Sequence, residues 1–574
     1  MYMKYKVRIP DSEKGISRKT IRGISYVYYT YAYIYSPEKK HTVPKDTSIG
    51  KVIPDESDMM YPNDRYLLYF PEADIPDELD ESERSGCLSV GAFIIIRKIL
   101  AEYHLDEMIN RIVGVDSGLF LDLAAYLIIE ENNAGQYYPD YAFRHPLFTD
   151  GMKVYSDSKV SSFMNSLSRN QSQDFLNEWN AKQDHREKIY ISYDSTNRSC
   201  SAGDIDLAEF GHPKVDDGKP VINQSVAFDH NNAVPLFYEE YPGSIVDVSQ
   251  LQLMLEKAKG YGYKHIGFIL DRGYFSKGNI QYMDSCGYSF IIMMKGMKKL
   301  VKQLVIHNKG TFEDKRENSI KGHNVHGITV PGHLYDSDDR IRYFHIFYDD
   351  FKKSSEKARI EDRIDRYADY LDRHEGTHVN LKEHFKKYFD LVYYHEGKED
   401  EKFMCYTEKY DVIDDEIDLC GYFVIITSEK MTAAQALDLY KSRDTSEKLF
   451  RADKSYLGNK SYRSHNRVSL DSKLFVEFVA LIIRNRIYTQ LKDHAVKEGK
   501  KNFLTVPAAI KELVKIEITR QTDHNYRLDH AVTKTQKEIL KAFGLTADDI
   551  RTQAIEINKD MHHNGTHKES HNNR

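Results

Sequence analysis

Residues 188–196 read KIYISYDST, a short and mostly apolar run that ends close to the acidic residue Asp194. A run rich in isoleucine and tyrosine is typical of a buried β-strand. Two more runs of the same kind follow, PVINQSVAFDH at 220–230 and VPLFYEEYPG at 234–243. This part of the chain therefore begins with three consecutive strands, and Asp194 is expected to end the first of them.

The next segments alternate between helix and strand. Residues 249–262 have the apolar spacing of an amphipathic helix, and HIGFILDRGY at 265–274 predicts a buried strand that ends at Asp271. Residues 277–287 then predict a helix and 288–295 another strand. Three strands followed by helix, strand, helix and strand is the ribonuclease H-like order. We therefore predict an α/β fold with a ribonuclease H-like core, a mixed sheet flanked by helices.

A second informative stretch, AQALDLYKSRDTSEKLFRADKSYLG, occupies residues 434–458. On a helix, Tyr440, Arg443, Glu447 and Lys454 would share an arc of roughly 60°. One carboxylate with two cations and a phenol on a single stripe suits a metal ion held beside a phosphate. Glu447 taken alone would be an ordinary solvated helix residue.

The predicted fold brings the acidic residues together. The first and fourth strands of a ribonuclease H-like sheet are neighbours, so Asp194 and Asp271 would face one another, and Glu447 would approach from a helix beside the sheet. Three convergent carboxylates can hold two Mg²⁺ ions. Each aspartate also has an ordinary interpretation, as a turn former or helix cap. The other candidates are weaker: Asp204 and Asp206, which follow no apolar strand, Asp284, which lies in a predicted helix, and His230 and His265, which are expected to be structural.

Taken together, D-x-T at Asp194, D-x-G-Y at Asp271 and Y-x2-R-x3-E-x6-K from Tyr440 resemble the DDE transposases of the Y-R-E-K group, the insertion-sequence-four-like transposases. The resemblance covers roughly residues 188–490. It implies that Asp194, Asp271 and Glu447 bind metal, that Arg443 and Lys454 contact DNA phosphates, and that Tyr440 lies near the terminal phosphate.

The resemblance also implies an activity. Two Mg²⁺ ions, for which Mn²⁺ would substitute, support cleavage of one strand at each terminal inverted repeat and transfer of the freed 3′-hydroxyl to target DNA. A homodimer would hold the paired ends of double-stranded DNA. Two alternatives remain open: a ribonuclease H-like nuclease without strand transfer, and a non-catalytic DNA-binding protein derived from a transposase.

Changes in composition along the chain divide it into seven parts. They are a β-rich basic module (1–70), an acidic linker (71–88), a helical domain to which the resemblance assigns DNA binding (89–185), the first part of the core (186–295), an inserted β-rich subdomain (296–425), the second part of the core with the Tyr440–Lys454 helix (426–495), and a C-terminal helical region with a disordered His-rich tail (496–574).

The charge distribution and the cysteines indicate which partner and which cellular compartment suit this protein. The net charge of −7 hides strong segregation, since residues 1–50 carry +6, residues 51–85 carry −8 and residues 440–501 carry +8. A polyanion responds to the local field, so DNA remains a suitable partner. Five scattered cysteines without a C-x-x-C pair favour a reducing compartment. With no apolar run of about 18 residues and no secretory signal, we expect a protein of the bacterial cytosol and nucleoid without a membrane partner.

Overall fold

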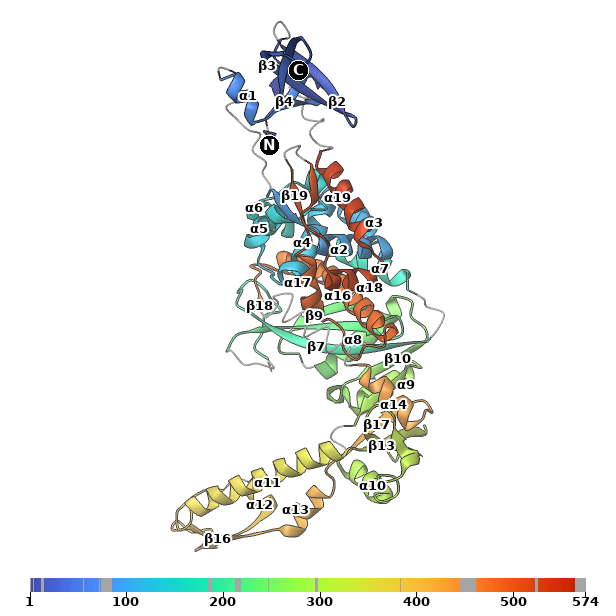
Figure 1. The fold of residues 1–574 in the computed structure, drawn as a ribbon. Helices are drawn as coiled ribbons and strands as arrows, with labels where there is room; N and C mark the ends of the chain where they lie inside the picture. Colours follow the sequence, from blue (N-terminus) through green and yellow to red (C-terminus); the bar gives the residue numbers. More distant parts are fainter. Residues whose placement is uncertain are drawn as a thin grey trace. The chain divides into compact units, whose positions relative to one another are not determined.

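The chain forms two compact units, each with its own core. Unit 1 comprises Met1–Phe175, Ser455–Asn459 and Arg463–Arg574, and unit 2 comprises Leu176–Lys454 and Lys460–Tyr462. The computed structural model (Figure 1) describes residues 2–3, 5–11, 15–54, 56–71, 73, 85–183, 188–211, 218–245, 247–294, 298–381, 383–443, 461–521 and 525–562. The His-rich tail and most of the acidic linker thus lie outside the described residues.

Unit 1 begins with a five-stranded antiparallel sheet in the order β1-β5-β4-β3-β2. Its elements are β1 (Val7–Arg8), β2 (Ile16–Ile21), β3 (Ile24–Ser36), β4 (His41–Ile53), β5 (Glu56–Pro62) and the short helix α1 (Asp64–Tyr69). The tyrosine-rich residues Ile24–Ser36 form the strand β3. Val27, Ile49 and Met60 are fully buried and form the centre of the module's core.

The rest of unit 1 is mainly helical. Its helices are α2 (Gly91–Tyr103), α3 (Leu105–Val113), α4 (Ser117–Glu130), α5 (Tyr138–Arg144), α6 (Asp157–Met164), α16 (Arg467–Lys497), α17 (Val506–Leu513), α18 (Lys534–Ala542) and α19 (Ala547–His562), and α7 (Arg169–Ala181) leads into unit 2. One stretch of the described residues, Leu105–Glu130, is long and apolar enough to cross a membrane by length and composition, with a mean hydropathy of 1.9. Contrary to our expectation, such a stretch therefore exists. It is broken at Gly114–Asp116, and 61% of its apolar window is buried, as in the core helices of a folded unit.

A small sheet in unit 1 corrects the expectation of an all-helical C-terminal region. It pairs β6 (Cys87–Ser89), β19 (Glu517–Arg520) and β20 (Tyr526–Leu528) in the order β20-β19-β6. Helix α17 ends at Leu513, and the chain continues into the strand β19. Ile516 and Ile518 are both buried, which is the two-residue period of a strand, and their β-branched side chains favour extended backbone.

Unit 2 contains the predicted core. Its large sheet runs in the order β12-β13-β14-β17-β11-β10-β7-β8-β9, with β18 pairing with β7. The first strands and helices along the chain are β7 (Ile189–Cys200), β8 (Val221–Asp229), β9 (Val234–Pro242), α8 (Asp247–Gly260), β10 (Ile266–Leu270), α9 (Lys277–Ser285) and β11 (Ser289–Met293). β7, β8 and β9 form an antiparallel meander, and β10 and β11 continue parallel to β7. The predicted order of elements is confirmed, and the pairing is the ribonuclease H-like one.

We expected an inserted β-rich subdomain after β11, but four strands of this region extend the main sheet. β17 (Tyr422–Thr427) pairs antiparallel with β11, and β14 (Arg342–Tyr348) pairs with β17. β12 (Ser319–Ile320) and β13 (Val325–Gly332) follow at the edge. A separate small core holds α11 (Asp350–Arg373), α12 (Glu383–Tyr388), β15 (Phe389–Tyr394), β16 (Lys402–Glu408) and α13 (Tyr410–Ile417). α10 (Lys298–Asn308), α14 (Ala433–Lys441) and β18 (Ser461–Tyr462) complete unit 2.

A buried histidine in this sheet makes the stability of unit 2 depend on pH. His345 of β14 is fully buried and lies 2.9 Å from the hydroxyls of Thr329 and Thr427. Burial lowers the pKa of His345 from 6.5 to about 4. Between these values the unfolded chain binds more protons than the folded one, so the contribution of His345 to stability is complete above pH 6.5 and is lost as the pH falls toward 4.

We therefore expect His345→Gln to flatten the loss of thermal stability between pH 6.5 and 4. Differential scanning calorimetry of unit 2's transition at several pH values measures this, and the exposed His265, replaced in the same way, is the matched control. An unchanged pH profile in His345→Gln would contradict the assignment.

Candidate active site

The backbone register brings the two predicted aspartates to neighbouring strands. β10 lies parallel to β7, with Leu270 opposite Tyr193. The next residues on the two strands are Asp271 and Asp194, and adjacent strands are about 4.8 Å apart. The described structure includes the backbone of Asp194 but not its side chain.

Asp194 does not end its strand, contrary to our expectation. β7 continues to Cys200, because β8 pairs with it all the way from Ile191 to Ser199. Asp194 itself lies opposite Val226 of β8. The parallel ladder with β10 nevertheless stops at Tyr193, so Asp194 is the first residue beyond that ladder and stands at its carboxyl edge. Residues at this edge line the functional crevice of open α/β sheets.

Asp271 follows a strand whose five residues are all buried. Its backbone stays extended, with φ −68° and ψ 156°, before a short 3-10 turn, η4 (Arg272–Tyr274). Its side chain makes no capping hydrogen bond to that turn and is 38% exposed. The carboxylate instead forms an ion pair with Arg443, with 3.1 Å between Oδ1 and Nη1. The side chain of Asp271 therefore does not cap the turn, but its carbonyl accepts from the amide of Tyr274 at 3.0 Å, so its interpretation as a turn former stands.

Helix α14 positions Arg443. The helix begins at a capping box in which Thr432 and Gln435 satisfy each other's backbone amides. Ala433, Ala436, Leu437 and Tyr440 form its buried face, which packs against β11, β13, β14 and β17. Arg443 follows in the next turn, where its backbone amide donates to the carbonyl of Tyr440 and its guanidinium lies 5.4 Å from the centre of the Tyr440 ring.

The predicted continuous helix from 440 to 454 is interrupted near its start. α14 ends at Lys441, with Ser442 as its C-cap, so Tyr440 is helical and Arg443 is not. The hydroxyl of Ser442 donates to the carbonyl of Leu439 at 2.6 Å, and a serine side chain that bonds to the backbone in this way competes with the helix. Glu447 and Lys454 lie outside the described residues.

Tyr440 is 7% exposed and packs with Ile269 of β10 and Ile425 of β17 in the sheet's core. The ring therefore has a structural contact, and its predicted place near a phosphate stays a prediction. Among the side chains that the structure describes, no three His, Cys, Asp or Glu residues cluster as a metal site. Two side chains of the predicted triad, those of Asp194 and Glu447, are not among the side chains that the structure describes.

The weaker candidates from the sequence include two aspartates of a loop and a histidine. Asp204 and Asp206 lie in the loop after β7, and both are exposed. His230 is packed edge-on against Phe228, and burial lowers its pKa to about 4, which fits the structural role we expected.

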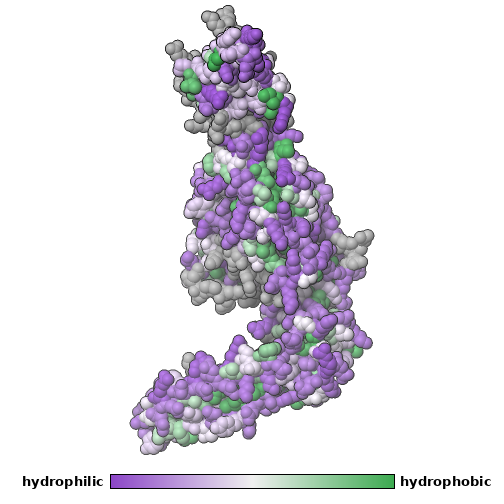
Figure 2. Space-filling model, in the orientation of Figure 1, coloured by the Kyte–Doolittle hydropathy of each residue, from purple (hydrophilic) through white to green (hydrophobic). Residues whose placement is uncertain are grey.

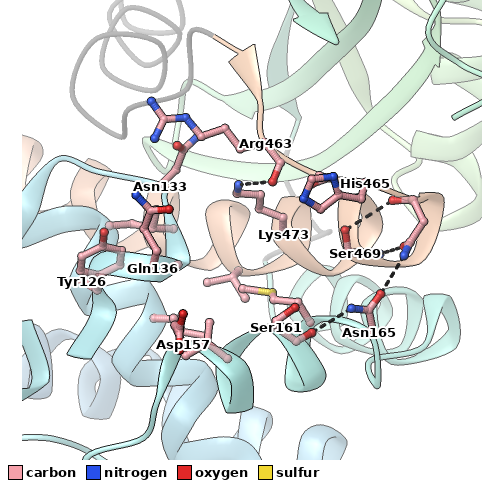
Figure 3. A pocket seen from close by; sticks show the side chains of 18 residues that line it. Tyr126, Asn133, Gln136, Asp157, Ser161, Asn165, Arg463, His465, Ser469 and Lys473 are labelled. Atoms are coloured by element: carbon pink, nitrogen blue, oxygen red, sulfur yellow. Dashed lines mark hydrogen bonds between the residues drawn. The ribbon is translucent and has the colours of Figure 1, made fainter. Parts of the chain in front are cut away.

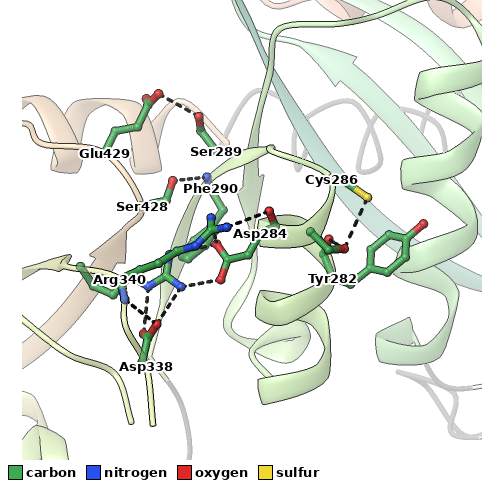
Figure 4. A network of polar contacts seen from close by, with 11 residues as sticks. Tyr282, Asp284, Cys286, Ser289, Phe290, Asp338, Arg340, Ser428 and Glu429 are labelled. Carbon is green, nitrogen blue, oxygen red and sulfur yellow. Dashed lines mark hydrogen bonds and ion pairs between the residues drawn. The ribbon is translucent and has the colours of Figure 1, made fainter. Parts of the chain in front are cut away.

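Asp284 lies in helix α9, as predicted, and its carboxylate is engaged by Arg340 and Arg342 (Figure 4). Arg342 also donates from Nε to Asp338 at 3.1 Å, and its guanidinium lies 5.5 Å from the ring centre of Phe290. These contacts join β14 to α9 and β11, so Asp284 serves the structure of the sheet.

A cavity of about 380 Å³ in unit 1 gathers basic side chains that the sequence analysis did not single out (Figure 3). Arg463, His465 and Lys473 line it beside Asp157 and several amides and hydroxyls. Lys473 is 9% exposed, and its Nζ donates to the carbonyl of Arg463 at 3.4 Å. The only signal in the sequence was the basic block at 440–501, because charge alone does not reveal which side chains share a cavity.

Comparisons with known proteins identify the family. The family model described as the transposase DDE domain matches residues 189–482. The match covers just over half of the chain, and the chain belongs to this family. No curated protein matches the chain.

Three solved structures are similar in part. The cryo-EM structure of the piggyBac transposase synaptic complex with hairpin DNA has 6% sequence identity and a TM-score of 0.32, over 63% of this chain and 59% of that chain. The Mos1 transposase paired-end complex with the left transposon end has 11% identity and a TM-score of 0.13, over 39% and 65%. The Mos1 mariner paired-end complex with Mn has 13% identity and a TM-score of 0.13, over 24% and 50%. The chain spans less than two thirds of the length of each.

Proposed function

We propose that this chain is a cut-and-paste DNA transposase of the Y-R-E-K group. It binds the terminal inverted repeats of a mobile element, cleaves a strand at each end and joins the freed 3′-hydroxyls to target DNA. The proposal rests on one observation above all. In a chain of the transposase DDE domain family, Asp194 and Asp271 follow directly on the last paired positions of two parallel strands, and Arg443 contacts the second of them.

The donor chemistry fits divalent metal ions. Asp271 is a partly exposed carboxylate at a strand end, Asp194 is at the adjacent position, and Glu447 follows Arg443 by four residues. Mg²⁺ prefers carboxylate oxygens and keeps open positions for substrate phosphate, and Mn²⁺ accepts the same ligands. When bound, two such ions activate the attacking oxygen and stabilise the leaving one. Asp194, Asp271 and Glu447 would hold them.

Arg443 has two tasks in this proposal. In the absence of DNA, its guanidinium partly neutralises the Asp271 carboxylate. Near a phosphodiester, the planar fork of the same side chain can bind two phosphate oxygens, which lysine cannot do with one ammonium group. Packing of the guanidinium against the buried Tyr440 fixes its position, and Lys454 would supply a second positive charge to the DNA.

The test of the function uses the full chain and a DNA duplex carrying the element's own ends. We expect cleavage only with Mg²⁺ or Mn²⁺, and we expect a pre-cleaved end to be joined to a target plasmid. Cleavage without joining would favour a nuclease, and binding without cleavage would favour a non-catalytic DNA-binding protein. We further propose that a homodimer holds two ends in the bacterial cytosol, which sedimentation with paired-end DNA would test.

Arg443→Gln gives a prediction on metal affinity. Removing the cation beside Asp271 removes its repulsion of a divalent ion, so the Kd for Mn²⁺ without DNA should fall by up to about fivefold, the scale of a partly exposed ion pair. Electron paramagnetic resonance of free Mn²⁺ measures it directly. Cleavage should nevertheless become slower, because the phosphate contact is lost.

The control for this prediction is Arg272→Gln. Arg272 is exposed and lies next to Asp271 in the sequence, so it tests whether any nearby positive charge has the same effect. An Mn²⁺ affinity that is equal in wild type and Arg443→Gln would contradict the proposed position of the metal.

A further inference from the structure

The far half of the β3–β4 hairpin extends beyond the rest of the N-terminal sheet. β2 pairs with β3 only over Ile24–Tyr29, and β5 pairs with β4 only over Gly50–Ile53. Between these limits, residues 31–45 form a two-stranded ribbon, and no other strand that the structure describes pairs with either of its edges. Tyr31 at its base stacks on Tyr69 of α1, with ring centres 5.5 Å apart.

Large side chains on both faces of this ribbon are exposed to solvent. Tyr33 and Tyr35 lie on one face and are 69% and 61% exposed, and Ile34 lies on the other face and is 52% exposed. Figure 2 shows hydrophobic side chains among hydrophilic ones on the surface of this module. A two-stranded hairpin has little stability of its own, and grouped exposed apolar and aromatic residues mark an interaction surface.

The charge of the ribbon indicates the kind of partner. Lys39, Lys40 and Lys45 are all exposed, and Glu38 is the single acidic residue of the ribbon. Lys39 and Lys40 lie in the turn at the tip, where Lys40 has the left-handed φ of 50° and the carbonyl of Lys39 contacts Nδ1 of His41 at 2.7 Å. Positive charge is therefore concentrated at the end that would meet a partner first.

We infer that this ribbon enters the major groove of duplex DNA. The inference rests on the proposed function and names the part of the chain that reads the DNA. A major groove about 12 Å wide admits a two-stranded β-ribbon, the tip lysines reach the phosphates along its walls, and Tyr33 and Tyr35 contact the bases or sugars. A second copy of the chain is a poorer occupant, because three lysines against one acidic residue give each ribbon a net positive charge, and two such ribbons repel one another.

The experiment uses the full-length protein, a duplex carrying the element's ends, and no divalent metal, so that binding is separated from cleavage. For Lys39→Gln with Lys40→Gln we expect a roughly tenfold rise in Kd, and a slope of log K against log salt smaller by about two. For Tyr33→Ser with Tyr35→Ser we expect a similar rise in Kd with an unchanged slope. Fluorescence anisotropy at several salt concentrations measures both.

A matched control uses the other exposed hairpin, β15–β16, where Tyr394 lies opposite Lys402. Tyr394→Ser with Lys402→Gln should bind DNA as wild type does. Dimethyl sulfate interference should appear at guanine N7, which lies in the major groove, and should weaken in the ribbon variants. Interference confined to adenine N3, in the minor groove, would overturn the groove assignment.

Other outcomes separate this inference from the proposed function. If wild type binds the duplex but does not cleave it with Mg²⁺ or Mn²⁺, the proposed function fails and the ribbon is still tested by its variants. If the ribbon variants bind as the control does, the inference is wrong whether or not cleavage occurs. Failure of wild type to bind duplex DNA, or a change in oligomeric state without a change in DNA affinity, would also overturn it.

Discussion

Replacing Asp271 by Asn is expected to slow DNA strand cleavage by at least about a thousandfold, which corresponds to a loss of about 4 kcal/mol of transition-state stabilisation. The amide that replaces the carboxylate is a weaker ligand for a divalent ion and carries no negative charge. The strand that ends at Asp271 is buried throughout, and the side chain itself is 38% exposed, so the fold should tolerate the change. Gel analysis of cleaved ends under single-turnover conditions measures the rate.

Binding of the same duplex should be nearly unchanged, because Asp271→Asn removes a negative charge and no phosphate contact. Glu447→Gln should behave alike if the predicted triad is right. The matched controls are Asp204→Asn and Asp206→Asn, which alter acidic residues of the loop after β7 and should cleave at the wild-type rate. Wild-type cleavage by Asp271→Asn, or loss of cleavage in either control, would reject the assignment.

Sequence patterns predicted the strands and helices whose formation depends on the residues within them. Each strand from β7 to β11 is an apolar run bounded by turns, and α8 and α9 have helical spacing, so their order could be read along the chain. The same reasoning predicted the position of Asp271, because an acidic residue directly after a fully apolar strand lies at the end of that strand, at the edge of the sheet. The length of β7 could not be read in this way. It depends on pairing with β8, so Asp194 lies within the strand.

Sequence patterns also could not predict which strands pair when they lie far apart in the chain. β14 and β17 have the composition of any buried strand, and nothing in that composition says that β17 pairs with β11 across more than a hundred residues. A short motif nevertheless predicted one contact that does not depend on strand pairing. The short spacing from Tyr440 to Arg443 anticipated their association, although α14 ends between them and the turn after it brings the guanidinium to Asp271.

Replacing Arg342 by Leu is expected to cost about 3–5 kcal/mol of the stability of unit 2, the largest effect on folding that we predict. The Arg342 side chain is 3% exposed, and it pairs with Asp284 and Asp338, whose side chains are 14% and 11% exposed. Burial alone would lower the pKa of Arg342, but hydrogen bonds to these two carboxylates raise it above its usual value. Without the guanidinium, two nearly buried carboxylates would lose their shared partner, which is the costly way to break a buried pair.

In a unit of this size such a loss lowers the midpoint of the thermal transition by roughly 5–8 °C, which differential scanning calorimetry of the full chain can measure. Arg340→Gln is the matched control, because Arg340 contacts the same Asp284 from a side chain that is 57% exposed, and an exposed pair is worth at most about 1 kcal/mol. Adding Asp284→Leu and Asp338→Asn to Arg342→Leu should restore part of the stability, since the unpaired charges are then gone. A midpoint within about 1 °C of wild type in Arg342→Leu, far below the expected shift, would show that the network contributes nothing to joining β14 to α9, and the three side chains would then need another explanation.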